Sequence, residues 1–326
     1  MGEKLLEIKD YCVTFTSEKI NSYAVNHINL TVEKGEVLGL VGETGAGKTT
    51  TALSIMGLLS KYGNHTSGEI YFNGSKLTRM KEKEYRKIRG QHISMIFQDP
   101  MTSLNPVFRV GDQIADVIKI HNKKMSQIEV NKKVDEIMKL VGISPERKVD
   151  YPHQFSGGMK QRIVIAIAIA CNPELLIADE PTTALDVTIQ AQVIKMMRNL
   201  QKELGSSVIL ITHDLGIVAN FCDKVAIMYG GEIVESGTLE EIFDKNRSHH
   251  PYTLGLFNSL PNIEEKTSRL KPIRGLTPHP SELPEGCKFH PRCPDCKDHC
   301  EVGENPKLYT EGTHSIQCHK FSRGEN

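Results

Sequence analysis

The stretch VLGLVGETGAGKT, residues 37–49, decides the fold of this chain. It opens with a compact apolar run, Val37 to Val41, passes through a glycine-rich loop, and leads into a stretch of helical character, Thr50 to Leu59. Residues 42–49 fit the pattern of a phosphate-binding loop, G-x-x-x-x-G-K-[ST], and stand between a strand and a helix. Glycines in such a loop let backbone N–H groups curl around phosphates, and the following helix points its positive end at them.

The loop predicts how a nucleoside triphosphate would be held. Lys48 would reach the β- and γ-phosphates, and the Thr49 hydroxyl would ligate Mg²⁺. A chance glycine-rich turn is the alternative, and the strand before the loop and the helix after it argue against that. The predicted nucleotide contacts in this stretch are Gly42, Thr44, Gly45, Ala46, Gly47, Lys48, Thr49 and Thr50.

A second apolar run, Leu175 to Ala178, ends in two acidic residues, Asp179 and Glu180. A carboxylate at the end of a buried strand is costly unless a cation faces it, and Mg²⁺ beside the phosphate loop is such a cation. Asp179 would hold the water shell of the metal, while Glu180 would orient and polarise the attacking water. On its own the pair could be a solvated strand end; the phosphate loop upstream favours the metal site.

The apolar runs predict an α/β fold. Further short runs at Val208–Thr212 and Val225–Tyr229, apolar on both faces, are typical of a parallel sheet covered by helices on both sides. A glycine pair then predicts a hairpin to Glu232–Glu235. Helix-spaced apolar positions between Asp99 and Phe155 predict a helical insertion. The residues before this sheet predict short strands and turns.

Composition indicates an ordinary globular chain. Of 326 residues, 39% are hydrophobic and 25% charged, and 40 basic residues balance 40 acidic ones, so no overall field attracts nucleic acid or anionic lipid. The longest apolar run, Ile163 to Cys171, is far shorter than the roughly 20 residues of a membrane-spanning helix and predicts a buried core helix. Residues 1–10 lack the apolar core of a signal peptide, so we expect a soluble protein.

The stretch FSGGMKQR, residues 155–162, resembles the signature motif of ABC transporter nucleotide-binding subunits. The resemblance spans roughly residues 5–243, and it implies a RecA-like parallel sheet with an antiparallel β subdomain and a helical subdomain at about 99–162. It is carried by five motifs in the family's order, which besides the signature are the phosphate loop, Gln98 after the run Ile93–Phe97, the loop Ala184-Leu185-Asp186 beyond Glu180, and His213.

The resemblance implies further roles in the site. Gln98 would sense Mg²⁺ and the attacking water, and His213 would contact the γ-phosphate. Phe15 would stack on adenine, with Tyr11 as the alternative. Within the signature the family more often has Leu and Gln where this chain has Phe155 and Met159, so a hydrogen bond from that amide is not expected here. Contacts to nucleotide are also implied for Ser156, Gly157, Gly158 and Asp186.

The resemblance also implies partners. The signature of one subunit closes over the phosphate loop of another, so two ATP molecules lie between two ATPase subunits, identical or different. Two polytopic permease subunits and, indirectly, an extracytoplasmic substrate-binding protein would complete the assembly, with this chain peripheral on the cytoplasmic face of the membrane.

Four further stretches of the sequence bear on which cargo is transported. They are similar to the corresponding stretches of ATPases of dipeptide and oligopeptide importers. Nickel importers belong to the same group, so both cargoes stay open. An ABC ATPase that acts on nucleic acid or ribosomes is a further alternative; the single cassette, the neutral charge and the lack of sustained heptads oppose it. The four stretches are residues 96–106, 151–154, 178–187 and 250–253.

Five of the eight cysteines crowd the proline-rich C-terminal segment, residues 251–326, which we expect to form a separate appendage outside the helix-and-sheet core. Disulfides do not suit the reducing compartment where ATP is made, and a polar segment offers little core to bury unrelated thiols. A metal that staples a coreless segment remains, either Zn²⁺ or an iron–sulfur cluster. The spacing is Cys287-x5-Cys293-x2-Cys296-x3-Cys300-x17-Cys318.

The uneven spacing favours a [4Fe–4S] cluster over zinc. Structural zinc usually shows two close pairs, and only Cys293 and Cys296 form one here. Resemblance to the tails of peptide-importer ATPases implies that Cys296 is the extra member or a substitute ligand. The implied ligands are then Cys287, Cys293, Cys300 and Cys318, with four nearby histidines expected at the surface, His290, His299, His314 and His319.

Overall fold

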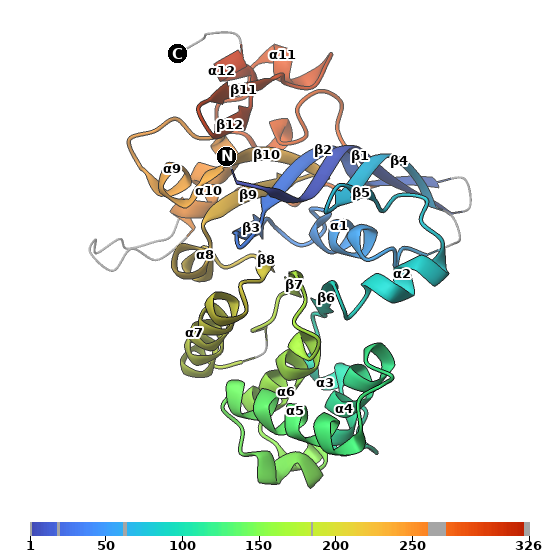
Figure 1. Ribbon diagram of the computed structural model, residues 1–326. Helices are drawn as coiled ribbons and strands as arrows, with labels where there is room; N and C mark the ends of the chain where they lie inside the picture. The colour runs from blue at the N-terminus through green and yellow to red at the C-terminus, as the bar shows by residue number, and fades with distance from the viewer. Residues whose placement is uncertain (1, 18–19, 61–63, 184, 260–271, 323–326) are drawn as a thin grey trace.

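The computed structural model describes residues 2–17, 20–60, 64–183, 185–259 and 272–322, and their strands form two sheets (Figure 1). The smaller sheet has the order β2-β1-β4-β5 and is antiparallel. The larger has the order β11-β12-β10-β9-β3-β8-β7-β6, in which the five strands from β9 to β6 run parallel. This is the predicted parallel sheet with an antiparallel region.

The strands are β1 (Lys4–Ser17), β2 (Ile20–Glu33), β3 (Val37–Val41), β4 (Asn64–Phe72), β5 (Ser75–Lys76), β6 (Ile93–Ile96), β7 (Leu175–Asp179), β8 (Ser207–Thr212), β9 (Lys224–Tyr229), β10 (Glu232–Thr238), β11 (Leu308–Glu311) and β12 (His314–Gln317). The helices are α1 (Lys48–Ile55), α2 (Glu82–Ile88), α3 (Pro100–Ser103), α4 (Val110–His121), α5 (Gln127–Leu140), α6 (Gly157–Ile169), α7 (Val187–Leu204), α8 (Leu215–Phe221), α9 (Leu239–Phe243), α10 (Pro251–Asn258), α11 (Asp298–Glu301) and α12 (His319–Ser322), with short 3-10 turns at Pro145–Val149, Pro152–Gln154 and His290–Arg292.

The central sheet separates two apolar cores. Along β7, Leu175 and Ile177 face the core shared with the smaller sheet and α1, whereas Leu176 and Ala178 face the core shared with α4–α8. Successive side chains of a strand point to opposite faces, so strands apolar throughout can fill both cores. The prediction of buried, doubly covered strands is confirmed.

The helical insertion is confirmed as α3–α6, which lies apart from the smaller sheet in Figure 1. Its α5 begins with a capping box in which Ser126 and Glu129 satisfy each other's backbone N–H groups. The run Ile163–Cys171 lies largely in α6, which is buried on most sides, as predicted. Among the described residues, no helix is both long and apolar enough to cross a bilayer.

Two expectations about the sheets are wrong. The first block does not consist of short strands, because β1 and β2 each run for 14 residues, with bulges that keep polar positions at the surface. The C-terminal segment is not excluded from the core either. Its β12 pairs with β10 at Glu235↔Ile316 and β11 pairs with β12, so the tail extends the central sheet by two strands.

Candidate functional site

The glycines of residues 42–49 let the loop approach its surroundings closely. A Cβ atom on Gly42 would lie 2.2 Å from the Met228 carbonyl oxygen, and one on Gly47 would lie 2.3 Å from the Ala24 carbonyl oxygen. Gly47 also has φ of 104°, a left-handed conformation that costs other residues energy. The loop is therefore folded tightly between β3 and α1.

The end of this loop offers positive charge. Gly47 gives α1 no side-chain cap, so the first N–H groups of the helix have no side-chain acceptor. Lys48 is buried and its Nζ donates to the carbonyl oxygens of Gly42 and Glu43 at 2.6 and 2.9 Å. Burial lowers the pKa of Lys48, and the carboxylates of Glu180, Asp179 and Glu43 oppose that shift. An anion at the helix start would satisfy both the lysine and the open N–H groups.

The surroundings of Asp179 show whether this site suits a divalent cation. It ends β7, is 1% exposed, and receives a hydrogen bond from the Thr49 hydroxyl. Its Oδ1 is buried and has no protein partner. Burial raises the pKa of this carboxyl, and the Thr49 hydrogen bond and the Lys48 charge only partly oppose that shift. A hard cation next to Thr49 and Asp179 would satisfy that oxygen, and the predicted pair therefore fits Mg²⁺.

Glu180 contacts two residues that were predicted to belong to the site, Gln98 and His213, and one that was not, Thr183. Its φ is 46°, a strained left-handed value for a residue with a side chain. Its carboxylate accepts hydrogen bonds from Gln98 Nε2 at 3.2 Å and from the Thr183 hydroxyl at 2.9 Å, and it contacts His213 Nδ1 at 3.2 Å. Burial raises the pKa of Glu180, but Thr183 and His213 outweigh that effect and hold it below its ordinary value. The carboxylate is thus ionised at neutral pH.

The structure therefore brings Gln98, Glu180 and His213 together although they come from three separate loops. Thr183 was missed by the sequence reasoning; its place three residues after Glu180, within hydrogen-bond reach of a turn, is the signal that could have found it. Ala184 of the predicted loop lies outside the described residues.

The signature residues occupy a different place. Ser156 caps α6 by accepting from the Met159 N–H, and a Cβ on Gly158 would lie 2.5 Å from Ile189 at the start of α7. Asp186 caps α7 in the same way, accepting from the Ile189 N–H at 3.0 Å. Ser156 and Gly157 are exposed at the start of their helix. These two residues therefore lie at the surface of this chain.

The two candidates for adenine stacking differ in exposure. Tyr11 is 3% exposed and packs within the core under the smaller sheet, so it has no free face for a base. Phe15 is half-buried at the edge of that core. Of the two, Phe15 remains the candidate.

The C-terminal cysteines line one cavity. Cys287, Cys293, Cys296, Cys300 and Cys318 surround a pocket of about 420 Å³, and all five thiols are free. Burial raises the pKa of Cys287 and of Cys293 to about 12, so they would be neutral thiols at pH 7 without a bound cation.

Electrostatic interactions connect the five thiols. Cys287 interacts electrostatically with Cys318 and Cys300, and Cys293 with Cys287 and Cys318. Cys296 interacts with one cysteine, Cys300, and its sulfur also contacts the Lys297 carbonyl oxygen and the Glu301 carboxylate. Cys296 thus has fewer cysteine neighbours than Cys287, and the choice of four metal ligands stays a prediction.

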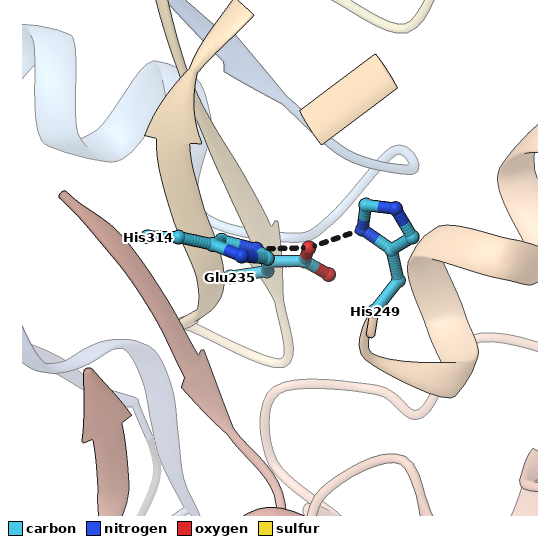
Figure 2. A group of neighbouring side chains, drawn as sticks. All are labelled: Glu235, His249 and His314. Carbon is cyan, nitrogen blue, oxygen red and sulfur yellow. Dashed lines mark hydrogen bonds and ion pairs between the residues drawn. The ribbon is translucent and has the colours of Figure 1, made fainter. Parts of the chain in front are cut away.

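The surface placement expected for His314 and His319 is wrong, since they are 5% and 6% exposed. His314 joins Glu235 and His249 in the buried cluster of Figure 2, the one group in the described part of the chain whose three ligand-type atoms lie within 4.8 Å of one another. Glu235 Oε1 is 2.7 Å from His249 Nδ1 and 2.8 Å from His314 Nε2, which are hydrogen-bond distances. The other nitrogen of His249 faces the Asp244 carbonyl oxygen at 2.8 Å.

Because both nitrogens of His249 face acceptors, the ring carries both protons and has no lone pair to offer a metal. Glu235 Oε2 is satisfied as well, by the His250 N–H and the Thr253 hydroxyl. The cluster is an ion pair that clamps β12 and the segment before α10 onto β10.

Two known protein families match parts of this chain. Residues 25–183 match a family described as ABC transporter, and residues 234–300 match one described as oligopeptide/dipeptide transporter, C-terminal region. The chain is 51% identical to the dipeptide transport ATP-binding protein DppD of Lactococcus lactis subsp. cremoris, over 89% of this chain and 83% of that protein. It is 45% identical to the oligopeptide transport ATP-binding protein AppD of Bacillus subtilis, over 96% of both. Among solved structures it is similar to the dimeric ATP-binding cassette MJ0796 bound to ADP and Pi, with a TM-score of 0.65 and 28% identity over 72% of this chain and 99% of that one.

Proposed function

This chain belongs to the ATP-binding subunits of dipeptide and oligopeptide ABC transporters, and from that premise we propose that it hydrolyses ATP to power the uptake of di- and oligopeptides. The observation that supports it most directly is the meeting of Glu180 with Gln98 and His213 beside the Lys48 loop. The matched relatives are named for dipeptide and oligopeptide transport, which favours peptide over nickel as cargo.

Each residue of the site has a step in hydrolysis. The N–H groups of residues 42–49 and the Lys48 ammonium hold the phosphates, and Phe15 stacks on adenine. Glu180, ionised and fixed by Thr183, accepts a hydrogen bond from the attacking water and orients it toward the γ-phosphate. His213, 62% exposed on the open side of Glu180, contacts the γ-phosphate. Mg²⁺, when bound, neutralises phosphate charge, and Thr49, Asp179 and Gln98 are the residues that would hold it and its water.

The subunit works as one half of a pair. Ser156 and Gly157 lie exposed at the start of α6, with Gly158 partly buried beside them, and there their N–H groups can cover the γ-phosphate held by a second ATPase subunit. ATP then bridges two subunits, and loss of the γ-phosphate on hydrolysis separates them. The helical part, about residues 99–162, receives two permease subunits on the cytoplasmic face of the membrane, with Gln98 at its junction to the sheet.

Reconstitution in vesicles tests the cargo. With the permease subunits, the second ATPase subunit and the substrate-binding protein, we expect di- or oligopeptides to accelerate ATP hydrolysis and to accumulate inside. Acceleration by Ni²⁺ and not by any peptide would overturn the peptide assignment while leaving the ATPase assignment intact.

We also propose that the C-terminal thiols hold a [4Fe–4S] cluster. A zinc ion with Zn–S bonds of about 2.3 Å places its four sulfurs about 3.8 Å apart. Among the described residues no three cysteine sulfurs lie within 4.8 Å of one another, a wider spacing than zinc needs. The cavity of about 420 Å³ between them supports a body larger than one ion. The proposed ligands are Cys287, Cys293, Cys300 and Cys318. The cluster would stabilise the fold of the C-terminal segment.

Paired cysteine variants test this cluster. Cys293→Ser should remove most of the iron and sulfide from protein purified without oxygen, together with the visible absorption between about 400 and 420 nm that iron–sulfur clusters give. Cys296→Ser, on the outer side of the same pocket, should retain both and serves as the matched control. Stoichiometric zinc without iron in the parent protein would contradict the cluster, and equal iron loss in both variants would contradict the choice of ligands.

A further inference from the structure

The second residue of the phosphate-binding loop is an acid. Glu43 lies between Gly42 and Thr44, and its carboxylate is close enough to Lys48 that each shifts the pKa of the other. A negative charge at this place would repel the polyphosphate that the loop binds. The loop therefore needs something that cancels the charge of Glu43.

That charge is met by the C-terminal segment. Arg292 forms a two-pronged ion pair with Glu43, with Nη1 to Oε2 at 2.5 Å and Nη2 to Oε1 at 3.1 Å, and the Arg292 side chain is only 5% exposed. The Thr277 hydroxyl donates to the same carboxylate at 2.8 Å. Burial raises the pKa of Glu43, yet these bonds keep it below its ordinary value, so the acid is ionised.

Arg292 is itself fixed on every side. Its Nε donates to the Arg274 carbonyl oxygen at 3.0 Å, and its guanidinium lies over the Tyr229 ring, 5.7 Å from the centroid. The backbone of Glu43 is also held, because its N–H donates to the Tyr252 hydroxyl of α10 at 2.9 Å. One loop residue is thus bound by three segments that lie more than two hundred residues further along the chain.

We propose that Arg292 is a positioning residue for ATP: by neutralising Glu43 it makes the phosphate-binding loop receptive to a triphosphate, so the C-terminal segment completes the nucleotide site of its own chain. The proposal rests on residues 42–49 being the ATP-binding loop. Arg292 directly precedes Cys293, so the residue that pairs with Glu43 is next in sequence to a residue that lines the thiol pocket.

The consequence is a defined pattern of ATP affinities. Arg292→Met keeps the length and apolar body of the side chain but leaves Glu43 unpaired, and we expect the Kd for ATP to rise about 10-fold. Glu43→Gln alone should bind ATP at least as tightly as the parent, because it removes the acid and leaves the positive charge of Arg292 beside the loop. The double variant Arg292→Met/Glu43→Gln should recover parental affinity within about 3-fold, which loss of packing alone would not permit.

Titration of each full-length subunit with a fluorescent ATP analogue measures these Kd values. Arg274→Met, an exposed arginine of the same segment, is the matched control and should bind as the parent does. Parental affinity in Arg292→Met, or equal weakening in Arg292→Met and the double variant, would overturn the neutralising role. If Lys48→Ala also bound ATP at parental affinity, residues 42–49 would not be the ATP site, and the proposed function and this inference would both fall.

Discussion

Replacing Glu180 by Gln should slow ATP hydrolysis by about 100-fold or more, since a positioned general base contributes about 10²–10⁴ in rate. The amide keeps the size of the side chain and can still bond to Thr183 or Gln98, but it cannot draw a proton from water. ATP binding should persist within about 2-fold, because the phosphate contacts of Lys48 and the loop are untouched. Trapped ATP would hold two subunits together, so the variant should elute as a stable dimer with ATP.

Two variants of neighbouring residues sharpen this test. Thr183→Val removes only the hydrogen bond that orients Glu180 and should reduce hydrolysis by a smaller factor, about 10-fold. Lys48→Ala should lose ATP binding and so fail to form the dimer at all. A Glu180→Gln subunit that hydrolysed ATP at the parental rate would exclude Glu180 as the base, whatever its geometry.

The central sheet and its motifs were readable from sequence because their signals are local. β3 and β7 are continuous apolar runs, and each is followed directly by the residues that carry chemistry. The roles of Gln98 and His213 beside Glu180 were implied by the family resemblance and not by spacing; in the structure the three residues follow neighbouring parallel strands, whose carboxyl ends share one edge of a sheet.

The C-terminal strands β11 and β12 could not be predicted from the sequence because polar contacts, and few apolar ones, hold them to the sheet. β11 is exposed along its whole length, and β12 buries one aliphatic residue, Ile316, beside His314. Alternating apolar residues, the usual sign of a strand, are therefore missing, and the many prolines argued for a separate segment. What docks β12 is the pairing of His314 with a charge on β10, which no local pattern displays.

The role of Glu43 could not be predicted from the sequence for a related reason. The phosphate-loop pattern leaves its position unspecified, so the acid carries no signal there. Its significance lies in the ion pair with Arg292, which joins residues far apart in the chain and depends on the tail folding back over β9 and α10. Contacts of this kind become visible only in three dimensions.

The second large effect is expected when Glu235, which is fully buried on β10, is replaced by Gln. Burial alone would raise the pKa of Glu235, but hydrogen bonds from His249, His314, Thr253 and the His250 N–H bring it down to about 2. The Glu235 and Asp244 acceptors raise the pKa of His249 despite its burial. Glu235→Gln would leave the His249 cation without its counter-charge and turn an amide N–H₂ toward groups that donate. Breaking a buried pair in this way costs about 3–5 kcal/mol of unfolding free energy.

Glu232→Gln provides the matched control on the same strand. Glu232 is 5% exposed, and burial raises its pKa to about 7, so its carboxyl is largely protonated below neutrality and resembles an amide. Its hydrogen-bond partners, Asn305 and Gln317, can bond to a glutamine oxygen. At pH 5.5–6 we expect this substitution to cost about 1 kcal/mol or less.

The cost of Glu235→Gln should depend on pH in a way that identifies the ion pair. The pKa of Glu235 is lowered on folding, so its stabilisation is complete above the unfolded value of 4.5 and is lost as the pH falls toward about 2. The pKa of His249 is raised, so its stabilisation is complete below the unfolded value of 6.5 and is lost as the pH rises through the raised value. The difference between parent and variant in urea unfolding should therefore be greatest between pH 4.5 and 6.5. A difference that stayed constant from pH 5 to pH 9 would show that Glu235 acts through packing and its hydrogen bonds with neutral groups, and would exclude the ion pair with His249.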